Sequence, residues 1–118
     1  MNNRRIQRIS QEIKKIISNL LIDGIKDPRI SKMTSITSVK VSNDLSYADI
    51  YISVLGRESE KEESLDGLKK AKGYIKKEIG SKIDLRHVPE LRFHLDDTLD
   101  HGMKIDEILR QIKEENLD

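Results

Sequence analysis

The chain has 118 residues, and its equal fractions of hydrophobic and charged residues, 36% each, allow one domain over residues 1–118 with a single small core. The formal net charge of +1 at pH 7 conceals a strong asymmetry along the chain. There is no cysteine, which excludes a disulfide framework, a thiolate zinc site and a thiol nucleophile.

The first predicted element is an amphipathic helix over about residues 3–23. Its apolar residues recur at spacings of three and four, namely Ile6, Ile9, Ile13, Ile16 or Ile17, Leu20 and Leu21. Gly24 follows the last apolar position, and Pro28 disfavours helical angles in the residue before it, so the helix ends there. The basic start of the chain lacks the apolar run of a signal peptide, and no segment is apolar enough to span a bilayer. We therefore expect a cytoplasmic protein with no membrane contact.

Two strands are predicted next, over the segments MTSITSVKVS and YADIYISVL. Both are rich in β-branched residues and alternate with a period of two. The expected inner faces are Thr37, Val39 and Val41 in the first strand and Ala48, Ile50, Ile52 and Val54 in the second. The Asn-Asp turn chemistry of the intervening SNDLS predicts a hairpin.

A long or broken helix follows the hairpin. Ser59 and Glu62 match the Ser-x-x-Glu capping box that marks a helix start. One apolar stripe continues from there, through Leu65, Leu68, Ala71, Ile75, Ile79 and Ile83. Gly73 lies in the middle of this helix, where a glycine costs about 1 kcal/mol relative to alanine.

The last part of the chain predicts a short third strand and a terminal helix. HVPELRFHLD places Leu91, Phe93 and Leu95 on one side of the strand. DDTLDHGMKIDEILRQI places Ile105, Ile108, Leu109 and Ile112 at helical spacing after the candidate N-caps Asp97 and Thr98. Residues 113–118 are expected to form a frayed acidic tail. Helices that cover one face of a small three-stranded sheet make a two-layer α+β domain.

The charges are collected in separate segments. Residues 1–30 carry seven Lys or Arg against three Asp or Glu, and residues 68–92 carry eight against three. Residues 57–67 reverse the balance with two against five, and residues 93–118 with three against eight. Segregated charge suggests a basic face, and a basic face suggests phosphate, although solvated helix surfaces would give the same counts.

Gly73 is the centre of the first predicted phosphate site. It falls away from the apolar stripe, and its neighbours three and four positions away are all lysines: Lys69, Lys70, Lys76 and Lys77. Bare backbone surrounded by cations, Lys72 included, would let a phosphate approach the main chain, and a helix break there would add free N–H donors. The alternative is a simple kink that wraps a small sheet, with the lysines serving solubility.

Arginines at the start of the first helix form the second predicted basic element. Arg4, Arg5 and Arg8 run against the helix dipole, which favours an external anionic partner, although a disordered basic arm would have the same sequence. Aromatic residues are only 3% of the chain, which is low for a protein that binds single strands by base stacking. Tyr47 and Tyr51 share one outward strand face, where cross-strand packing is the simpler explanation. A folded RNA recognised by shape and backbone fits the composition better.

An enzymatic alternative rests on the segment HLDDTLDHG. Asp96, Asp97, Asp100 and His101, with His94 nearby, have the density of carboxylates and imidazoles that a metal-dependent ribonuclease needs. A structural explanation is simpler, because Asp97 and Thr98 cap the last helix and Asp100 suits its first turn. We predict no metal, no cofactor and no catalytic residue.

Four stretches of the chain carry a family resemblance: DPRI at residues 27–30, VKVSNDLSYADIYISV at 39–54, KKAKGYIKKEI at 69–79 and RHVPELRFHLDDTLDHGMKIDEIL at 86–109. Together they resemble the ribosome-binding factor A family of bacterial small-subunit assembly factors. The resemblance implies a type II KH-like domain of order α-β-β-α-α-β. In this family an Ala-x-Gly helix kink, here Ala71-Lys72-Gly73, replaces the Gly-x-x-Gly loop of KH domains. Because this chain lacks the full Gly-x-x-Gly loop, we do not expect it to clamp four nucleotides as KH domains do.

The resemblance also implies a function. Members of the family bind the free 30S subunit and its 16S ribosomal RNA near the neck, support late maturation and processing of the RNA 5′ end, and are most needed in the cold. They are not thought to be enzymes. We expect a monomer without a small-molecule substrate, and a protein-interaction adaptor remains a further alternative. The predicted RNA-binding residues are Arg4, Arg5, Arg8, Lys69, Lys70, Lys72, Gly73, Lys76 and Lys77.

Overall fold

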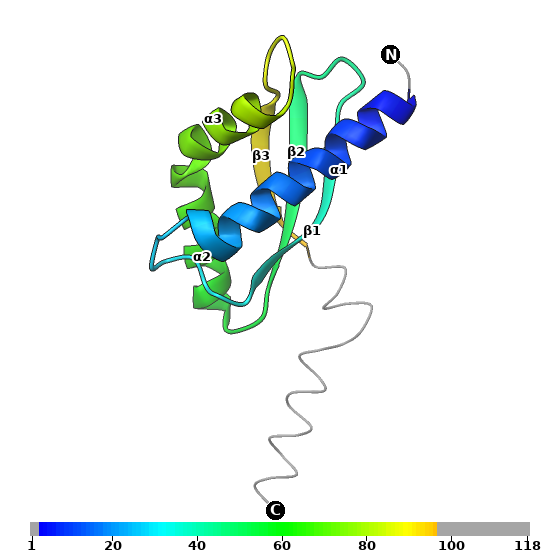
Figure 1. The fold of residues 1–118 in the computed structure, drawn as a ribbon. Helices are drawn as coiled ribbons and strands as arrows, with labels where there is room; N and C mark the ends of the chain where they lie inside the picture. The colour runs from blue at the N-terminus through cyan, green and yellow to red at the C-terminus, as the bar shows by residue number, and fades with distance from the viewer. Residues whose placement is uncertain (1–2, 97–118) are drawn as a thin grey trace, which may run out of the picture.

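The computed structural model describes residues 3–96, and the elements follow the predicted order through the third strand (Figure 1). They are α1 (Asn3–Asn19), the π-helical turn η1 (Leu20–Gly24), β1 (Thr34–Val41), β2 (Tyr47–Val54), α2 (Glu58–Lys70), α3 (Lys72–Lys82) and β3 (Glu90–Leu95). The predicted terminal helix, with its caps Asp97 and Thr98, and the acidic tail over residues 113–118 lie outside the described residues.

The three strands form one mixed sheet in the order β1-β2-β3. β1 and β2 are antiparallel, as the predicted hairpin requires, and β3 runs parallel to β2 because α2 and α3 carry the chain back along the sheet. α1 crosses the sheet, and α2 and α3 lie beside it (Figure 1). The two-layer α+β, KH-like architecture is therefore confirmed.

The core lies between the helices and one face of the sheet. Isoleucines at the predicted α1 positions are buried, among them Ile13 and Ile17, which are fully inaccessible. The sheet contributes Ala48, Ile50, Ile52, Val54, Leu91 and Phe93 to the same cluster. The alternation in β2 and β3 therefore predicted the inner face correctly.

In β1 the predicted inner face is wrong at one position. The pairing with β2 shifts between Ile36 and Ser38, so Thr37 is the extra residue of a β-bulge. Before the bulge Ile36 is buried in the core, whereas after it Val41 is buried as predicted. Thr37 instead donates its hydroxyl to a carboxylate oxygen of Asp96 at 2.6 Å.

The start of α2 also differs from the prediction. The helix begins at Glu58, and the Glu60 carboxylate accepts a hydrogen bond from the Arg57 backbone N–H at 3.4 Å. The predicted pair, Ser59 and Glu62, therefore lies inside the helix. Glutamates at both 60 and 62 offer this three-residue spacing, to Arg57 and to Ser59 respectively, and Glu60 is the one that caps the helix.

The predicted broken helix is two helices that meet at Ala71. Ala71 has φ −84° and ψ 2°, and its carbonyl accepts the Ile75 N–H at 2.9 Å. The predicted stripe is confirmed on both sides of this junction, since Leu68, Ile75 and Ile79 are fully buried. The break thus falls two residues before Gly73, which is the second residue of α3.

Candidate nucleic-acid interface

The α2–α3 junction presents bare backbone at Gly73, as the helical spacing predicted. Gly73 is exposed, and a Cβ added there would meet no atom within 4 Å beyond its chain neighbours and the backbone of its own helix. The glycine therefore does not serve packing against another element. Because α3 starts at Lys72, the N–H groups of Lys72, Gly73 and Tyr74 belong to its first turn and have no carbonyl partner within that helix. Backbone donors without a Cβ in front of them suit an anion.

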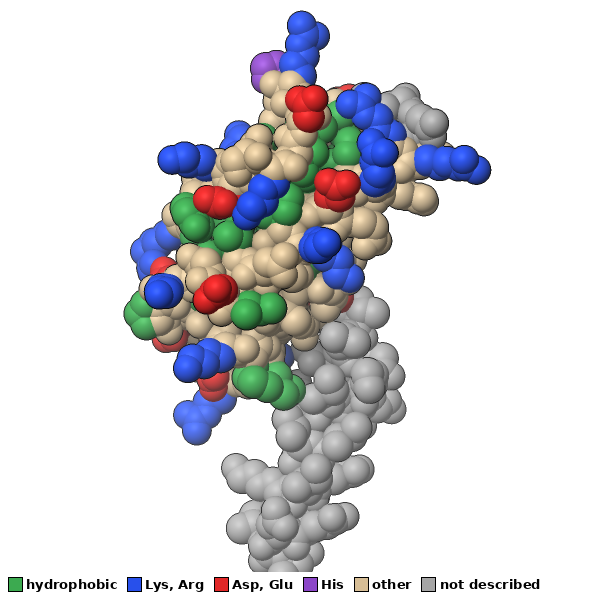
Figure 2. Space-filling model, in the orientation of Figure 1, with side chains coloured by type: hydrophobic (Ala, Val, Ile, Leu, Met, Phe, Trp, Pro, Cys, Tyr) green, Lys and Arg blue, Asp and Glu red, His purple; other side chains and the backbone are tan. Residues whose placement is uncertain are grey.

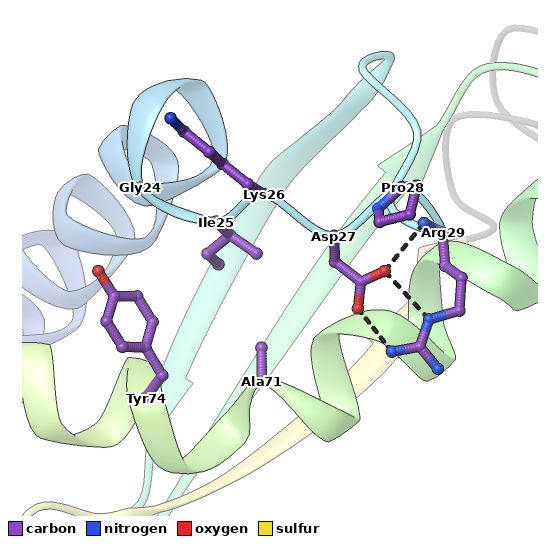
Figure 3. Close-up of a pocket in the computed structure, with 8 residues that line it drawn as sticks. All are labelled: Gly24, Ile25, Lys26, Asp27, Pro28, Arg29, Ala71 and Tyr74. Carbon is purple, nitrogen blue, oxygen red and sulfur yellow. Dashed lines mark hydrogen bonds and ion pairs between the residues drawn. The ribbon is translucent and has the colours of Figure 1, made fainter.

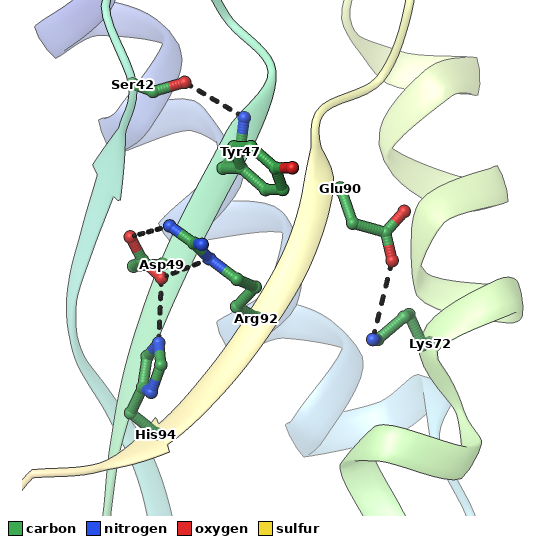
Figure 4. Close-up of polar contacts among 7 residues, drawn as sticks. All are labelled: Ser42, Tyr47, Asp49, Lys72, Glu90, Arg92 and His94. Carbon is green, nitrogen blue, oxygen red and sulfur yellow. Dashed lines mark hydrogen bonds and ion pairs between the residues drawn. The ribbon is translucent and has the colours of Figure 1, made fainter.

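The lysines around Gly73 fall into two groups. Lys69, Lys70 and Lys77 are exposed, and no salt bridge involves them within the described part of the chain. Lys76 and Lys72 instead reach Glu90 on β3, with Nζ–Oε distances of 3.3 Å and 3.6 Å (Figure 4 draws the Lys72 contact). The hydrogen bond from Lys76, together with its charge, lowers the pKa of Glu90. Helical spacing alone did not reveal this partner, because Glu90 comes from another element.

Arg4, Arg5 and Arg8 are exposed in the first turns of α1. They lie at the end of α1 remote from the junction (Figure 1). A helix of this length spans about 25 Å, so the two predicted basic elements are separate clusters. On the face drawn in Figure 2, Lys and Arg side chains are widely spread and acidic side chains lie among them. The structure therefore brings the lysines together around Gly73 and leaves the arginines apart.

A shallow hollow, which we call the Tyr74 hollow, opens beside the junction with a volume of about 730 Å³. It is lined by Gly24, Ile25, Lys26, Asp27, Pro28, Arg29, Ala71 and Tyr74 (Figure 3). From the sequence, this region indicated only the end of the first helix and, through DPRI, a family resemblance. The pocket joins segments far apart in the chain, and this proximity was not visible in the local pattern.

The loop on one side of the hollow is held by the Asp27–Arg29 pair. The Asp27 carboxylate accepts hydrogen bonds from the Arg29 backbone at 2.9 Å and from its guanidinium at 3.0 and 2.6 Å. These bonds, led by those from the side chain, lower the pKa of Asp27 to about 2. The fully buried Ser64 of α2 also anchors the loop, since its hydroxyl accepts a hydrogen bond from the Ser31 N–H at 2.9 Å. The hollow therefore has a fixed wall.

The aromatic side chains on the helix-free face of the sheet already have protein partners. The Arg92 guanidinium lies over the Tyr47 ring at 4.3 Å, and the Tyr51 and His94 rings stack at 5.1 Å. Asp49 accepts two hydrogen bonds from Arg92, at 2.8 and 2.9 Å, and contacts His94 at 2.8 Å (Figure 4). This arrangement supports cross-strand packing as the role of both tyrosines.

Of the proposed metal ligands Asp96, Asp97, Asp100 and His101, only Asp96 lies within the described residues. Its carboxylate accepts the Thr37 hydroxyl, and its N–H donates to the Ile52 carbonyl at 2.7 Å. Over residues 3–96, no three metal-ligating side chains come together. No helix in the same range has the length and apolar character needed to cross a membrane.

Comparisons with known proteins agree on one family. The family model described as ribosome-binding factor A matches residues 5–109. A ribosome-binding factor A from Finegoldia magna is 52% identical over 117 residues, which cover 98% of this chain and 97% of that protein.

Solved structures show the same fold. A solution structure of a Thermotoga maritima protein, described as a putative ribosome binding factor A, has 33% identity and a TM-score of 0.70, covering 80% of this chain and 90% of that one. A homology model of the Thermus thermophilus ribosome binding factor A, fitted into a cryo-electron-microscopy map of a 30S complex, has 20% identity and a TM-score of 0.62, covering 75% of this chain and 91% of that one.

Proposed function

The chain belongs to the ribosome-binding factor A family, and we propose on that basis that it is a non-enzymatic assembly factor of the small ribosomal subunit. Its partner is the 30S subunit, contacted through 16S ribosomal RNA. The family name supports ribosome binding, and the 30S particle is the partner of the Thermus thermophilus protein with the same fold. We place its action in the bacterial cytoplasm, where these subunits assemble.

Finer parts of the function follow from the resemblance. We propose that the protein acts late in maturation of the 30S subunit, accommodates processing of the 16S RNA 5′ end, and matters most in the cold. It acts as a monomer and cleaves no RNA itself.

The open backbone at Gly73 is the observation that carries the binding mechanism. A phosphate can approach the first turn of α3 there without meeting a side chain at position 73. Lys69, Lys70 and Lys77 provide exposed cations around that point. Of the nine residues predicted from the sequence, Lys72 and Lys76 form ion pairs with Glu90. We propose that Gly73 and the six remaining cations make the direct contacts, namely Arg4, Arg5, Arg8, Lys69, Lys70 and Lys77.

The salt dependence of binding to purified 30S subunits tests this mechanism. If six cations each neutralise one phosphate, log K should fall against log salt with a slope of roughly −4 to −5. Co-sedimentation with immature and mature particles over a range of potassium chloride gives the slope. A slope near zero would contradict electrostatic RNA binding.

Reversal of the free lysines tests where the contact lies. We expect the triple variant K69E, K70E, K77E to bind 30S subunits at least about ten-fold more weakly, because three phosphate contacts become repulsive. A triple reversal of the exposed Lys15, Lys32 and Lys40 changes the net charge equally and controls for it.

Two outcomes would favour the alternatives. Capture of a partner that survives both nuclease treatment and the lysine reversals would support a protein-interaction adaptor. RNA cleavage by the pure protein that is lost in Asp96→Ala would support a ribonuclease.

A further inference from the structure

The Tyr74 hollow combines an open aromatic ring with an apolar floor. Tyr74 is 46% exposed, and its side chain extends from α3 toward Ile25 (Figure 3). Ile25, Pro28 and Ala71 supply apolar lining between the ring and the opposite wall. A planar apolar surface with an aromatic side is the kind of site on which a nucleobase stacks, because every base has a π-face.

Tyr74 differs from the other tyrosines in its surroundings. Tyr47 is covered by Arg92 and Tyr51 by His94, with Lys40 over the same Tyr51 ring at 5.6 Å. Within residues 3–96, no ring or cation is stacked on Tyr74. Its ring is thus available to an external partner, although its exposed fraction is close to the 44% of Tyr47.

The charges at the rim favour an anionic partner. Lys26 lines the hollow, and the exposed Lys70 directly precedes Ala71, another residue of its lining. Arg29 balances Asp27 through its bidentate pairing, so the rim keeps a positive excess from the lysines. The open backbone of Gly73 lies one residue along the chain from the ring. A nucleotide meets both requirements, since its base is apolar in face and its phosphate is anionic.

We propose that the Tyr74 hollow receives one unpaired base of the bound RNA. The base stacks on the Tyr74 ring over Ile25 and Ala71, and the adjoining phosphates lie against Lys26 and Lys70. This inference rests on the proposed function and deepens it, because it names a nucleotide that is splayed out of the folded RNA. One such base is compatible with the low aromatic content, which argued only against stacking along a whole strand.

The test uses a short oligouridine that carries one central 2-aminopurine, whose fluorescence falls when it stacks. An otherwise identical oligonucleotide with an abasic centre is the matched probe, and the anisotropy of an end label reports binding separately. We expect the unmodified protein and Tyr74→Phe to quench 2-aminopurine. Tyr74→Ala should abolish quenching and weaken binding roughly ten-fold, the low part of the range for one stacked base.

Two controls make the result specific. Tyr47→Ala removes a tyrosine of nearly equal exposure from the sheet and should quench as the unmodified protein does. The abasic probe should bind the unmodified protein and Tyr74→Ala equally. Absence of quenching by the unmodified protein, or equal quenching by Tyr74→Ala, would overturn the base site. Neither result would affect the proposed function, which co-sedimentation of the unmodified protein with 30S subunits tests independently.

Discussion

Glycines in α2 and α3 have different physical roles, although they look alike in the sequence. A Cβ at Gly67 would lie 2.7 Å from Cγ1 of Ile30, so this glycine allows the loop after α1 to pack on α2. A Cβ at Gly80 would lie 3.2 Å from Cγ2 of Val88. A Cβ at Gly73 would have no such neighbour within 4 Å. Only at Gly73 does the absence of a side chain have no explanation within the described part of the fold.

Gly73→Ala therefore separates stability from binding. Alanine is favoured over glycine in a helix and has room here, so the free energy of unfolding should rise by up to about 1 kcal/mol. Affinity for 30S subunits should fall about ten-fold, since the methyl group blocks a charge-assisted backbone contact. Urea denaturation and co-sedimentation measure the two effects.

Gly80→Ala is the control for that variant. It changes the same residue type in the same helix at another exposed position, and it should leave 30S affinity unaltered. If Gly73→Ala were more stable and bound as well as the unmodified protein, the open backbone would have no part in binding.

At the scale of elements, periodicity in the sequence correctly predicted most of the buried faces of the helices and strands. The stripe through Leu68, Ile75 and Ile79 and the alternation in β2 were both correct. The bulge at Thr37 was not predictable, because both Ile36 and Val39 are acceptable inner residues and only the pairing with β2 decides. The Ser59 cap failed for a similar reason, since two glutamates compete at equal spacing. The Tyr74 hollow was missed because its walls come from distant segments.

The helix ends at the junction partly explain the lysines without any RNA. α2 has Glu58 and Glu60 in its first turn and Lys69 and Lys70 in its last, which is the order that its dipole favours. At Ala71 the negative end of α2 meets the positive end of α3, so the two partial charges oppose each other. The backbone N–H groups near Gly73 can still donate hydrogen bonds, but the positive charge there comes mainly from the lysine side chains. Whether those lysines are free or paired with carboxylates therefore affects anion binding.

The contact between α3 and β3 should consequently restrain RNA binding. Glu90→Gln removes the carboxylate that holds Lys72 and Lys76, so both ammonium groups become available to phosphate. We expect tighter 30S binding at low salt and a slope steeper by about 1 to 2, with little change in stability because exposed ion pairs contribute little. The measurement is the same salt titration.

Glu78→Gln provides a control of equal charge. Glu78 forms an ion pair with Lys82 at 3.2 Å, and both residues belong to α3, away from the junction. Equal tightening in both variants would mean that net charge, rather than the position of the freed lysines, governs binding.

For the whole molecule, the question is whether its two basic clusters contact one RNA surface. The arginines and the junction lysines are separated by about the length of α1, roughly 25 Å. This exceeds the Debye length of about 8 Å at physiological salt, so each cluster acts on phosphate independently of the other. The segregated charge seen in the sequence thus becomes two separate contacts rather than one continuous patch.

Neutralising each cluster by itself tests this two-point contact. Replacing Arg4, Arg5 and Arg8 by glutamine, or Lys69, Lys70 and Lys77 by glutamine, should each lower the magnitude of the salt slope by about 2 to 3. Because the sites are distant, the two losses of binding free energy should add within about 0.5 kcal/mol in the sixfold variant. If the arginine variant kept the full slope, the RNA interface would be confined to the α2–α3 junction, and the basic start of α1 would be solvated surface.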